Sequence, residues 1–160
     1  MRRSALFLTA AALVVGAANL SAQTVNFTGT WTPVVDPNAP AGRGGGGNGP
    51  MTITMDAKTM TITRTTQAGE QKTVYNLDGS DSKNMMAGRN GAAGVEVISK
   101  AKLDGGKVIV ATTRDFNGVS NTTTVTYWLD GGKLMTSSLS NQPGRDGSPP
   151  VARVMTYTKS

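Results

Sequence analysis

The chain contains no cysteine and no histidine in its 160 residues. Without cysteine it forms no disulfide and presents no thiolate to a metal ion or a substrate. Without histidine it lacks the side chain that most often acts as general base and metal ligand near neutral pH. These absences exclude thiol redox chemistry and cysteine nucleophiles, and we expect no enzyme activity, no cofactor and no metal site.

Acidic residues are also scarce, ten in total, and most of them fall in turn-like or loop-like sequence. Those outside such sequence are Glu70, Glu96 and Asp115. A hydrolase built on paired carboxylates would need two of them to face each other in a cleft. This is the third functional hypothesis for the chain; a membrane-embedded barrel is favoured less still, because the predicted strands are short and Thr-rich and aromatic residues are too few for two girdles.

Long apolar runs are absent after the N-terminus. One such run, residues 5–18, follows two arginines and precedes the small residues Ser21 and Ala22. This order is typical of a secretory signal peptide, and the run is shorter than the roughly twenty residues of a membrane-spanning helix. The sequence therefore predicts a helical signal peptide over 1–22 and a single exported domain over 23–160, either periplasmic or secreted.

Basic residues give the whole chain a formal net charge of +6, of which the leader carries two charges. The remaining Lys and Arg are scattered singly, with no run of the kind that follows a phosphate backbone. We therefore expect no nucleic-acid partner. No segment of the mature chain is long and apolar enough to predict a transmembrane helix.

Alternating apolar residues dominate the chain after residue 22. Val108 and Val110 are an example, and similar short runs rich in Thr, Val and Ile are separated by Gly, Asn and Asp. A period of two with one polar face is typical of an antiparallel sheet. It predicts an all-β domain, an antiparallel up-and-down meander of eight to ten strands that closes into a small barrel. The predicted strands are 25–35, 51–56, 59–66, 71–77, 83–87, 94–103, 107–114, 119–129, 133–140 and 151–159.

A Leu-Asp-Gly sequence recurs at residues 77–79, 103–105 and 129–131. Asp-Gly supplies the positive φ angles that tight hairpin turns require, so these three segments are predicted to be turns. In an up-and-down meander, alternate connections lie at opposite ends of the sheet. The three turns therefore share one end of the predicted barrel, and the longer connections share the other end.

The longer connections are rich in glycine, and each carries one arginine. They cover 36–50, 88–93 and 141–150, with Arg43, Arg89 and Arg145 respectively. Three arginines at one end predict a mouth that attracts anions. The alternative is that they are solvated charges in flexible loops. The Gly-rich loop at 36–50 lacks the Gly-Lys-Ser/Thr ending of a phosphate-binding P-loop, and no helix is expected after it.

The first predicted strand contains Phe27-Thr28-Gly29-Thr30-Trp31. A Gly-x-Trp on the first strand of a meander barrel resembles the calycin superfamily, which comprises lipocalins, fatty-acid-binding proteins and avidins. The last four residues look most like the opening of bacterial avidins. The segment from the phenylalanine onward looks like that of fatty-acid-binding proteins, which also have ten strands. The resemblance implies a closed barrel that binds a small ligand without catalysis.

The same resemblance implies roles for residues of the last predicted strand. Fatty-acid-binding proteins hold the ligand carboxylate with an Arg-x-Tyr there, whereas Arg153 and Tyr157 share a face but are four residues apart. Lipocalins lay a cation from the last strand across the first-strand tryptophan, which makes Lys159 the candidate here. Gly29, Trp31 and Lys159 are thus expected to be structural, and Arg153 and Tyr157 to contact the ligand.

Together these features favour an exported, non-enzymatic barrel that binds a small apolar or amphipathic ligand at its loop-rich mouth. The main alternative is a protein-interaction or inhibitor module that uses the long loops 36–50 and 141–150 as its contact surface. The two hypotheses differ in where the partner sits, because a small ligand needs space inside the barrel.

Overall fold

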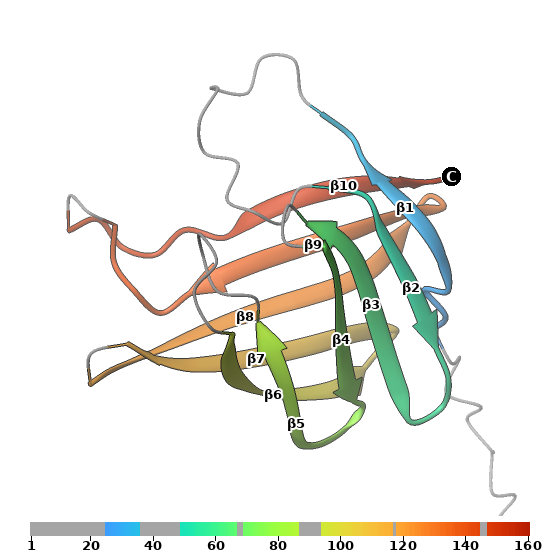
Figure 1. Ribbon diagram of the computed structural model, residues 1–160. Coiled ribbons are helices and arrows are strands. Elements are labelled where there is room, and N and C mark those ends of the chain that lie inside the picture. The colour runs from blue at the N-terminus through green and yellow to red at the C-terminus, as the bar shows by residue number, and fades with distance from the viewer. Residues whose placement is uncertain (1–24, 36–48, 67–68, 87–93, 117, 145–146) are drawn as a thin grey trace, which may run out of the picture.

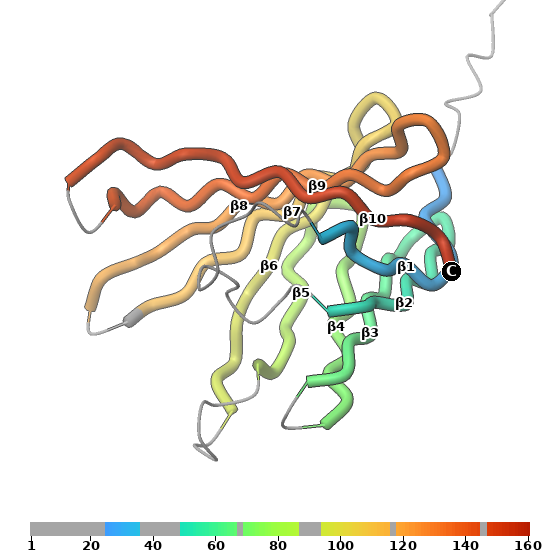
Figure 2. Tube along the Cα trace, turned by 90° about the horizontal axis from the view of Figure 1, so that it is seen from above, coloured from blue at the N-terminus to red at the C-terminus, as the bar shows by residue number. Residues whose placement is uncertain are grey.

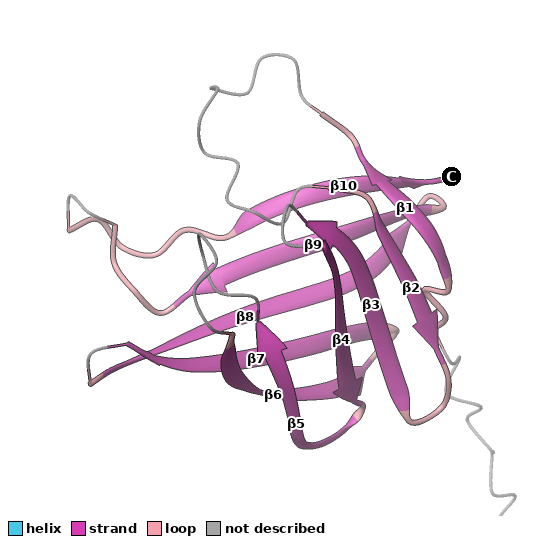
Figure 3. Ribbon diagram, in the orientation of Figure 1, coloured by secondary structure: helices cyan, strands magenta, loops and turns pink. Residues whose placement is uncertain are grey.

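A computed structural model describes residues 25–35, 49–66, 69–86, 94–116, 118–144 and 147–160 (Figure 1). The predicted leader at 1–22 and the arginines Arg43, Arg89 and Arg145 lie outside these described residues. The described part of the chain contains strands and no helix (Figure 3). The described residues therefore include no helix long and apolar enough to cross a membrane.

Ten strands make up the described structure. They are β1 (Gly29–Pro33), β2 (Met51–Met55), β3 (Thr59–Thr66), β4 (Gly69–Asn76), β5 (Asp78–Met86), β6 (Val95–Asp104), β7 (Lys107–Phe116), β8 (Val119–Asp130), β9 (Lys133–Ser140) and β10 (Arg153–Lys159).

All neighbouring strands pair antiparallel in the order β4-β3-β2-β1-β10-β9-β8-β7-β6-β5. Consecutive strands pair with each other except for β4 and β5, and the pairing of β1 with β10 joins the two ends of the meander. Figures 1 and 2 show β1–β4 lying across the inclined strands β6–β9. The structure confirms the predicted all-β, up-and-down meander and shows a nearly closed barrel.

The barrel has two unlike ends, as the order of connections predicts. The turn end holds the short connections β2–β3, β4–β5, β6–β7 and β8–β9, together with residues 25–28. The loop end holds the connections β1–β2, β3–β4, β5–β6, β7–β8 and β9–β10. The half of the barrel next to the turn end is the turn half, and the half next to the loop end is the loop half.

Two of the tight turns use a pair of glycines. Asp104 pairs with Lys107, and Asp130 pairs with Lys133, so two residues close each hairpin. Those residues are glycines with φ of 53° and 82° in the first turn and 54° and 77° in the second. The left-handed conformation therefore falls on Gly-Gly, one residue later than the Asp-Gly interpretation places it.

β5 begins at Asp78, five residues before the predicted start at residue 83. A β-bulge between Asp78 and Asp81 shifts the register, so polar residues that look like a long turn pair with β6 instead. The next inward positions, Ser82 and Asn84, are buried although they are polar. An apolar alternation cannot reveal a strand whose inward residues are polar.

The turn half of the barrel is filled by apolar side chains. Phe27 and Leu134 have 0% exposure, and Tyr157 has 2%. The indole N–H of Trp31 donates to the Phe27 carbonyl at 2.8 Å, which satisfies the polar atom of the buried ring. This half supplies the hydrophobic core.

Lys159 covers the core at the turn end. Its Nζ lies 5.8 Å from the centroid of the Trp31 ring, within cation–π range. Gly29 has a φ of 146°, and a Cβ there would stand 2.5 Å from Cε of Lys159. The structure thus brings together the three residues that the calycin resemblance marks as structural. Trp128 lies on the outer surface of β8, where Nζ of Lys107 stands 5.7 Å from its ring centroid.

Candidate functional site

The strand register shows which residues line the barrel, because residues directly opposite each other share a face. Buried Val108 and Val110 on β7 therefore place their partners on β8, Tyr127 and Val125, on the inner face. The same face continues toward the loop end through Thr112 opposite Thr123 and Arg114 opposite Asn121. Arg114 therefore lies on the inner face of the barrel.

Two more arginines occupy inner-face positions. On β3, Arg64 follows buried Ile62 by two residues and lies opposite buried Met51, whose Sδ accepts a hydrogen bond from Arg64 Nη2 at 3.0 Å. On β10, Arg153 precedes buried Tyr157 by four residues and lies opposite Ser138. We call Arg64, Arg114 and Arg153 the inner arginines.

Two of the inner arginines, Arg64 and Arg114, influence the pKa of nearby tyrosines. Burial raises the pKa of Tyr75, and the charges of Arg64 and Arg114 both act to lower it. Burial also raises the pKa of Tyr127, with Arg64 again opposing the shift. Both phenols are consequently neutral hydrogen-bond donors at physiological pH, and Arg64 and Arg114 contribute to the potential at one shared position.

No described inner-face position on the strands carries a carboxylate. Glu70, Glu96 and Asp115 each neighbour an inward residue and therefore point outward, and Glu96 forms an ion pair with Lys83 at 3.9 Å. The paired-carboxylate interpretation thus finds no support in the described barrel lining.

The lining around the inner arginines is polar. Ser99, with 1% exposure, shares a hydrogen bond of 2.8 Å with Thr112. The Ser140 hydroxyl donates to Oδ1 of Asn121 at 3.2 Å. Further polar inner-face residues of the loop half are Gln71, Thr73, Thr123 and Ser138. Hydroxyls and amides thus replace the apolar lining of the turn half.

An apolar rim follows at the loop end. Met86 lies opposite Val95, and Val119 begins β8 two residues before inward Asn121. Val95 is 58% exposed and Val119 is 56% exposed. From the turn end to the loop end, the interior therefore changes from apolar to polar and basic, and then to aliphatic at the rim.

Side chains close the seam between β4 and β5, where no backbone ladder joins neighbouring strands. The Val74 N–H donates to Oδ1 of Asn84 at 2.8 Å, and Nδ2 of Asn84 donates to the Val74 carbonyl at 2.9 Å. The Asn76 N–H donates to the Ser82 hydroxyl at 2.8 Å. This explains why β5 has buried polar residues on its inner face.

The sequence-predicted ligand residues are only partly placed. Arg153 lies on the inner face of the loop half, and Tyr157 lies in the core with its hydroxyl directed at Met155 Sδ, 3.8 Å away. Arg64 and Arg114 were missed by sequence reasoning. The missed signal is the alternation itself, because each arginine continues an inward series that begins with buried apolar residues.

Arginine and lysine residues occupy different parts of this molecule. Outside the leader, every arginine is either an inner arginine or belongs to a connection whose flanking strands end at the loop end. Every lysine is exposed, on the outer face or at the turn end. Arginine presents a planar fork that matches oxyanions, whereas lysine is a strongly hydrated point charge. The side chains best suited to oxyanions are therefore concentrated in the loop half.

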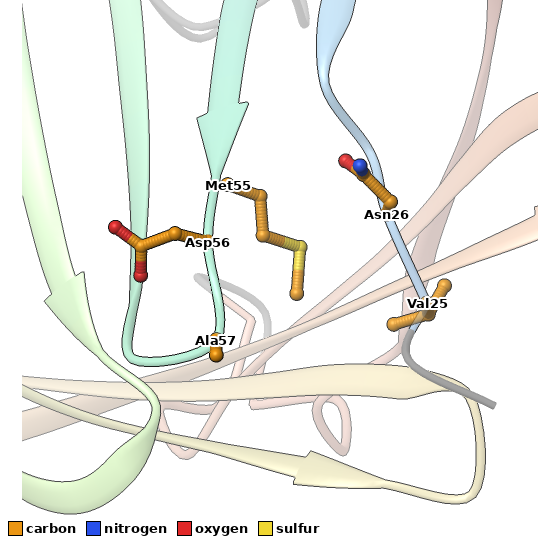
Figure 4. Close-up of a pocket in the computed structure, with 5 residues that line it drawn as sticks. All are labelled: Val25, Asn26, Met55, Asp56 and Ala57. Carbon is orange, nitrogen blue, oxygen red and sulfur yellow. The ribbon is translucent and has the colours of Figure 1, made fainter. Parts of the chain in front are cut away.

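A separate pocket of about 220 Å³ lies at the turn end, lined by Val25, Asn26, Met55, Asp56 and Ala57 (Figure 4). Figure 4 shows the Asp56 carboxylate turned away from Val25 and Asn26. Oδ1 of Asp56 accepts the N–H groups of Lys58 and Thr59, both at 2.7 Å, and these bonds lower its pKa. The carboxylate is committed to the β2–β3 turn, so this pocket offers little chemistry.

No family model matches the chain, and no curated protein matches it either. Several solved structures are similar to it. The fluorescent protein UnaG is 20% identical with a TM-score of 0.54, covering 84% of this chain and 97% of that one. A secretory abundant heat soluble protein from Ramazzottius varieornatus is 14% identical with a TM-score of 0.53, covering 84% and 95%.

The fatty-acid-binding protein of Manduca sexta matches a smaller part, 69% of this chain and 72% of that one, with 18% identity and a TM-score of 0.43. The strand order, the near closure of the sheet and the similarity to UnaG define a calycin-like fold for this chain.

Proposed function

We propose that the protein is a non-enzymatic barrel that binds a small amphipathic ligand through an acidic group held in the loop half. One observation carries this proposal. Three arginines, from β3, β7 and β10, occupy inner-face positions in the loop half.

An acidic group fits because it relieves the electrostatic cost of this arrangement. Arg64 is half-buried and Arg114 and Arg153 are exposed, and an oxyanion near these like charges lowers their mutual repulsion. Arginine also donates bidentate, charge-assisted hydrogen bonds to carboxylates and phosphates. The neutral phenols of Tyr75 and Tyr127 add hydrogen-bond donors on the same inner face.

The apolar part of the ligand is proposed to lie toward the rim. Side chains of the core fill the turn half, whereas Met86, Val95 and Val119 offer aliphatic surface near the mouth. A purely apolar ligand in the loop half would desolvate hydroxyls and amides without replacing their hydrogen bonds. This favours the amphipathic ligand over the apolar one.

Export remains part of the proposal, with residues 1–22 as a cleaved leader and the domain either periplasmic or secreted. The order of charged, apolar and small residues supports it. N-terminal sequencing of the protein from a secreting cell is expected to give a chain that starts at Gln23. A retained Met1 would contradict it.

The ligand proposal is tested by titrating a fluorescent long-chain carboxylate and the neutral alcohol of the same length. The carboxylate is expected to bind on the order of tenfold more tightly, with the difference shrinking as salt is added. Arg64→Gln is expected to abolish the preference. Lys72→Gln is the matched control, because Lys72 lies on the outer face opposite Thr63, next to Arg64.

Equal binding of the two probes, or no saturable binding, would overturn the ligand proposal. The protein-interaction alternative stays a prediction, since most of the loop 36–50 lies outside the described residues. It would gain support if neither probe binds and a protein partner is lost when loops 36–50 and 141–150 are shortened.

A further inference from the structure

All three tyrosines of the chain point into the barrel, because each lies opposite a buried apolar residue of a neighbouring strand. The hydroxyl of Tyr157 is directed at Met155 Sδ, 3.8 Å away. The hydroxyls of Tyr75 and Tyr127 have no hydrogen-bond partner among the described residues, although Tyr127 is only 5% exposed. A buried polar group without a partner costs folding free energy. The packing of the barrel therefore does not explain these two hydroxyls.

The two hydroxyls face space that solvent can reach from inside the barrel. Among the described residues, every side-chain oxygen or nitrogen that is fully shielded from solvent has a hydrogen-bond partner. Since Tyr75 and Tyr127 have none, their hydroxyl oxygens are not fully shielded. The hydroxyl of Thr136, opposite Tyr127 and in a residue that is 6% exposed, also lacks a partner in the described part of the chain. Several hydroxyls thus line the same interior.

One cation acts on both phenols. Burial raises the pKa of Tyr75 and of Tyr127, and the Arg64 guanidinium opposes the shift in both. Tyr75 adds to the rise in the pKa of Tyr127, so their hydroxyls lie near each other although β4 and β8 are not neighbouring strands. Arg64 Nη2 donates to Met51 Sδ at 3.0 Å, and a thioether is a weak acceptor. Two phenols and one guanidinium therefore converge on one region.

We propose that Tyr75 and Tyr127 donate the hydrogen bonds that hold the acidic group of the ligand, with Arg64 as its counter-charge, and that this group is singly charged. The inference rests on the proposed function, because it names the donors and the charge of the group bound there. It places the acidic group on β3, β4 and β8. The calycin resemblance instead marks Arg153 and Tyr157 on the last strand.

The charge of the acidic group follows from the cations around it. Arg64 is half-buried, whereas Arg114 and Arg153 are exposed. A carboxylate balances the one cation that acts on both phenols. A second negative charge would lose hydration in the barrel, while the exposed arginines that could compensate it are screened by solvent. A carboxylate is therefore favoured over a phosphate dianion.

The experiment compares tyrosine variants in titrations with a fluorescent long-chain carboxylate and the neutral alcohol of the same length. Tyr75→Phe and Tyr127→Phe each remove one hydroxyl and keep the ring. Each is expected to weaken carboxylate binding on the order of tenfold and to leave binding of the alcohol unchanged. Tyr157→Phe is the matched control and is expected to bind the carboxylate like the unaltered chain, because its hydroxyl is directed at Met155.

Two further measurements test the charge of the group and the role of the hydroxyls. An alkyl phosphate of the same length, doubly charged at about pH 8, is expected to bind the unaltered chain more weakly than the carboxylate does. Urea unfolding of Tyr127→Phe without ligand is expected to show unchanged or higher stability, since the substitution removes a polar group that has no partner. Lower stability together with lower affinity would assign this hydroxyl to folding and contradict the proposal.

Three binding results would also overturn the assignment: unchanged carboxylate affinity in both Tyr75→Phe and Tyr127→Phe, an equal loss with Tyr157→Phe, or tighter binding of the phosphate. If one of them occurs while Arg64→Gln still abolishes the preference for the carboxylate over the alcohol, the proposed function stands and only this assignment fails. If the unaltered chain shows no such preference, the proposed function fails as well.

Discussion

The turn half and the loop half are built from the same strands, yet they are lined by different chemistry. On β7 the inward series passes from Val108 and Val110 to Thr112 and Arg114 without a break in pairing. The backbone pairing is thus the same in both halves although the inner side chains differ. One end of a strand can therefore belong to the core while the other end lines a binding site. The apolar half stabilises the barrel, which leaves the polar half open to recognition.

The largest expected effect tests where stability resides. Leu134→Ala removes a side chain with 0% exposure in the turn half and is expected to lower the free energy of unfolding by about 2–5 kcal/mol. Ser138→Ala, two inward-facing positions farther toward the loop end on the same strand, is expected to change it by less than about 1 kcal/mol. Urea unfolding measures both, and similar losses would break the comparison.

The seam between β4 and β5 tests whether the loop half also contributes to stability. Asn84→Ala leaves the Val74 N–H and carbonyl without their side-chain partner, at a cost of about 1–3 kcal/mol. Hydrogen exchange at Val74 is expected to accelerate more than exchange in β7. Lys83→Ala, on the outer face beside Asn84, serves as the control. Unchanged exchange at Val74 would show that the side-chain bonds contribute nothing.

A substitution at Gly29 tests how tightly the backbone and Lys159 pack at the turn end. Gly29→Ala places a Cβ against Lys159 in a left-handed conformation, and the expected loss is about 1–3 kcal/mol. Adding Lys159→Ala relieves the steric part but not the backbone part, so the double variant is expected to recover only some of the loss. Full recovery would show that the backbone strain is negligible.

The smallest expected effect concerns alkaline pH. Burial raises the pKa of Tyr127 above its ordinary value of 10.0, so the unfolded chain loses the phenol proton first. Stability is therefore full below pH 10 and falls above it, by at most about 1.4 kcal/mol per pH unit for this group. Tyr127→Phe is expected to flatten the decline in urea unfolding between pH 9 and 11. An unchanged slope would contradict it.

Most of the fold could be predicted from the sequence, because alternation and glycine turns are local signals. The start of β5 could not, since Ser82 and Asn84 are inward for a reason that lies on another strand, the closure of the seam. Arg153 was marked through a family resemblance. Arg64 and Arg114 were not, although the alternation of β3 and β7 places them inward, because a charged residue that ends an apolar series is indistinguishable by sequence from a solvated strand end.

The seam also divides the molecule in a way that its sequence order hides. Eight of the nine strand pairings join consecutive strands, and the ninth joins β1 to β10. The barrel consequently consists of two meanders, β1–β4 and β5–β10. They are joined by the pairing of β1 with β10, in which Thr32 lies opposite Thr158. Chain continuity between the meanders depends on the single link at Leu77. Two fragments made by dividing the chain after Leu77 are thus expected to reassemble into the barrel, with the β1–β10 pairing as the backbone contact between them.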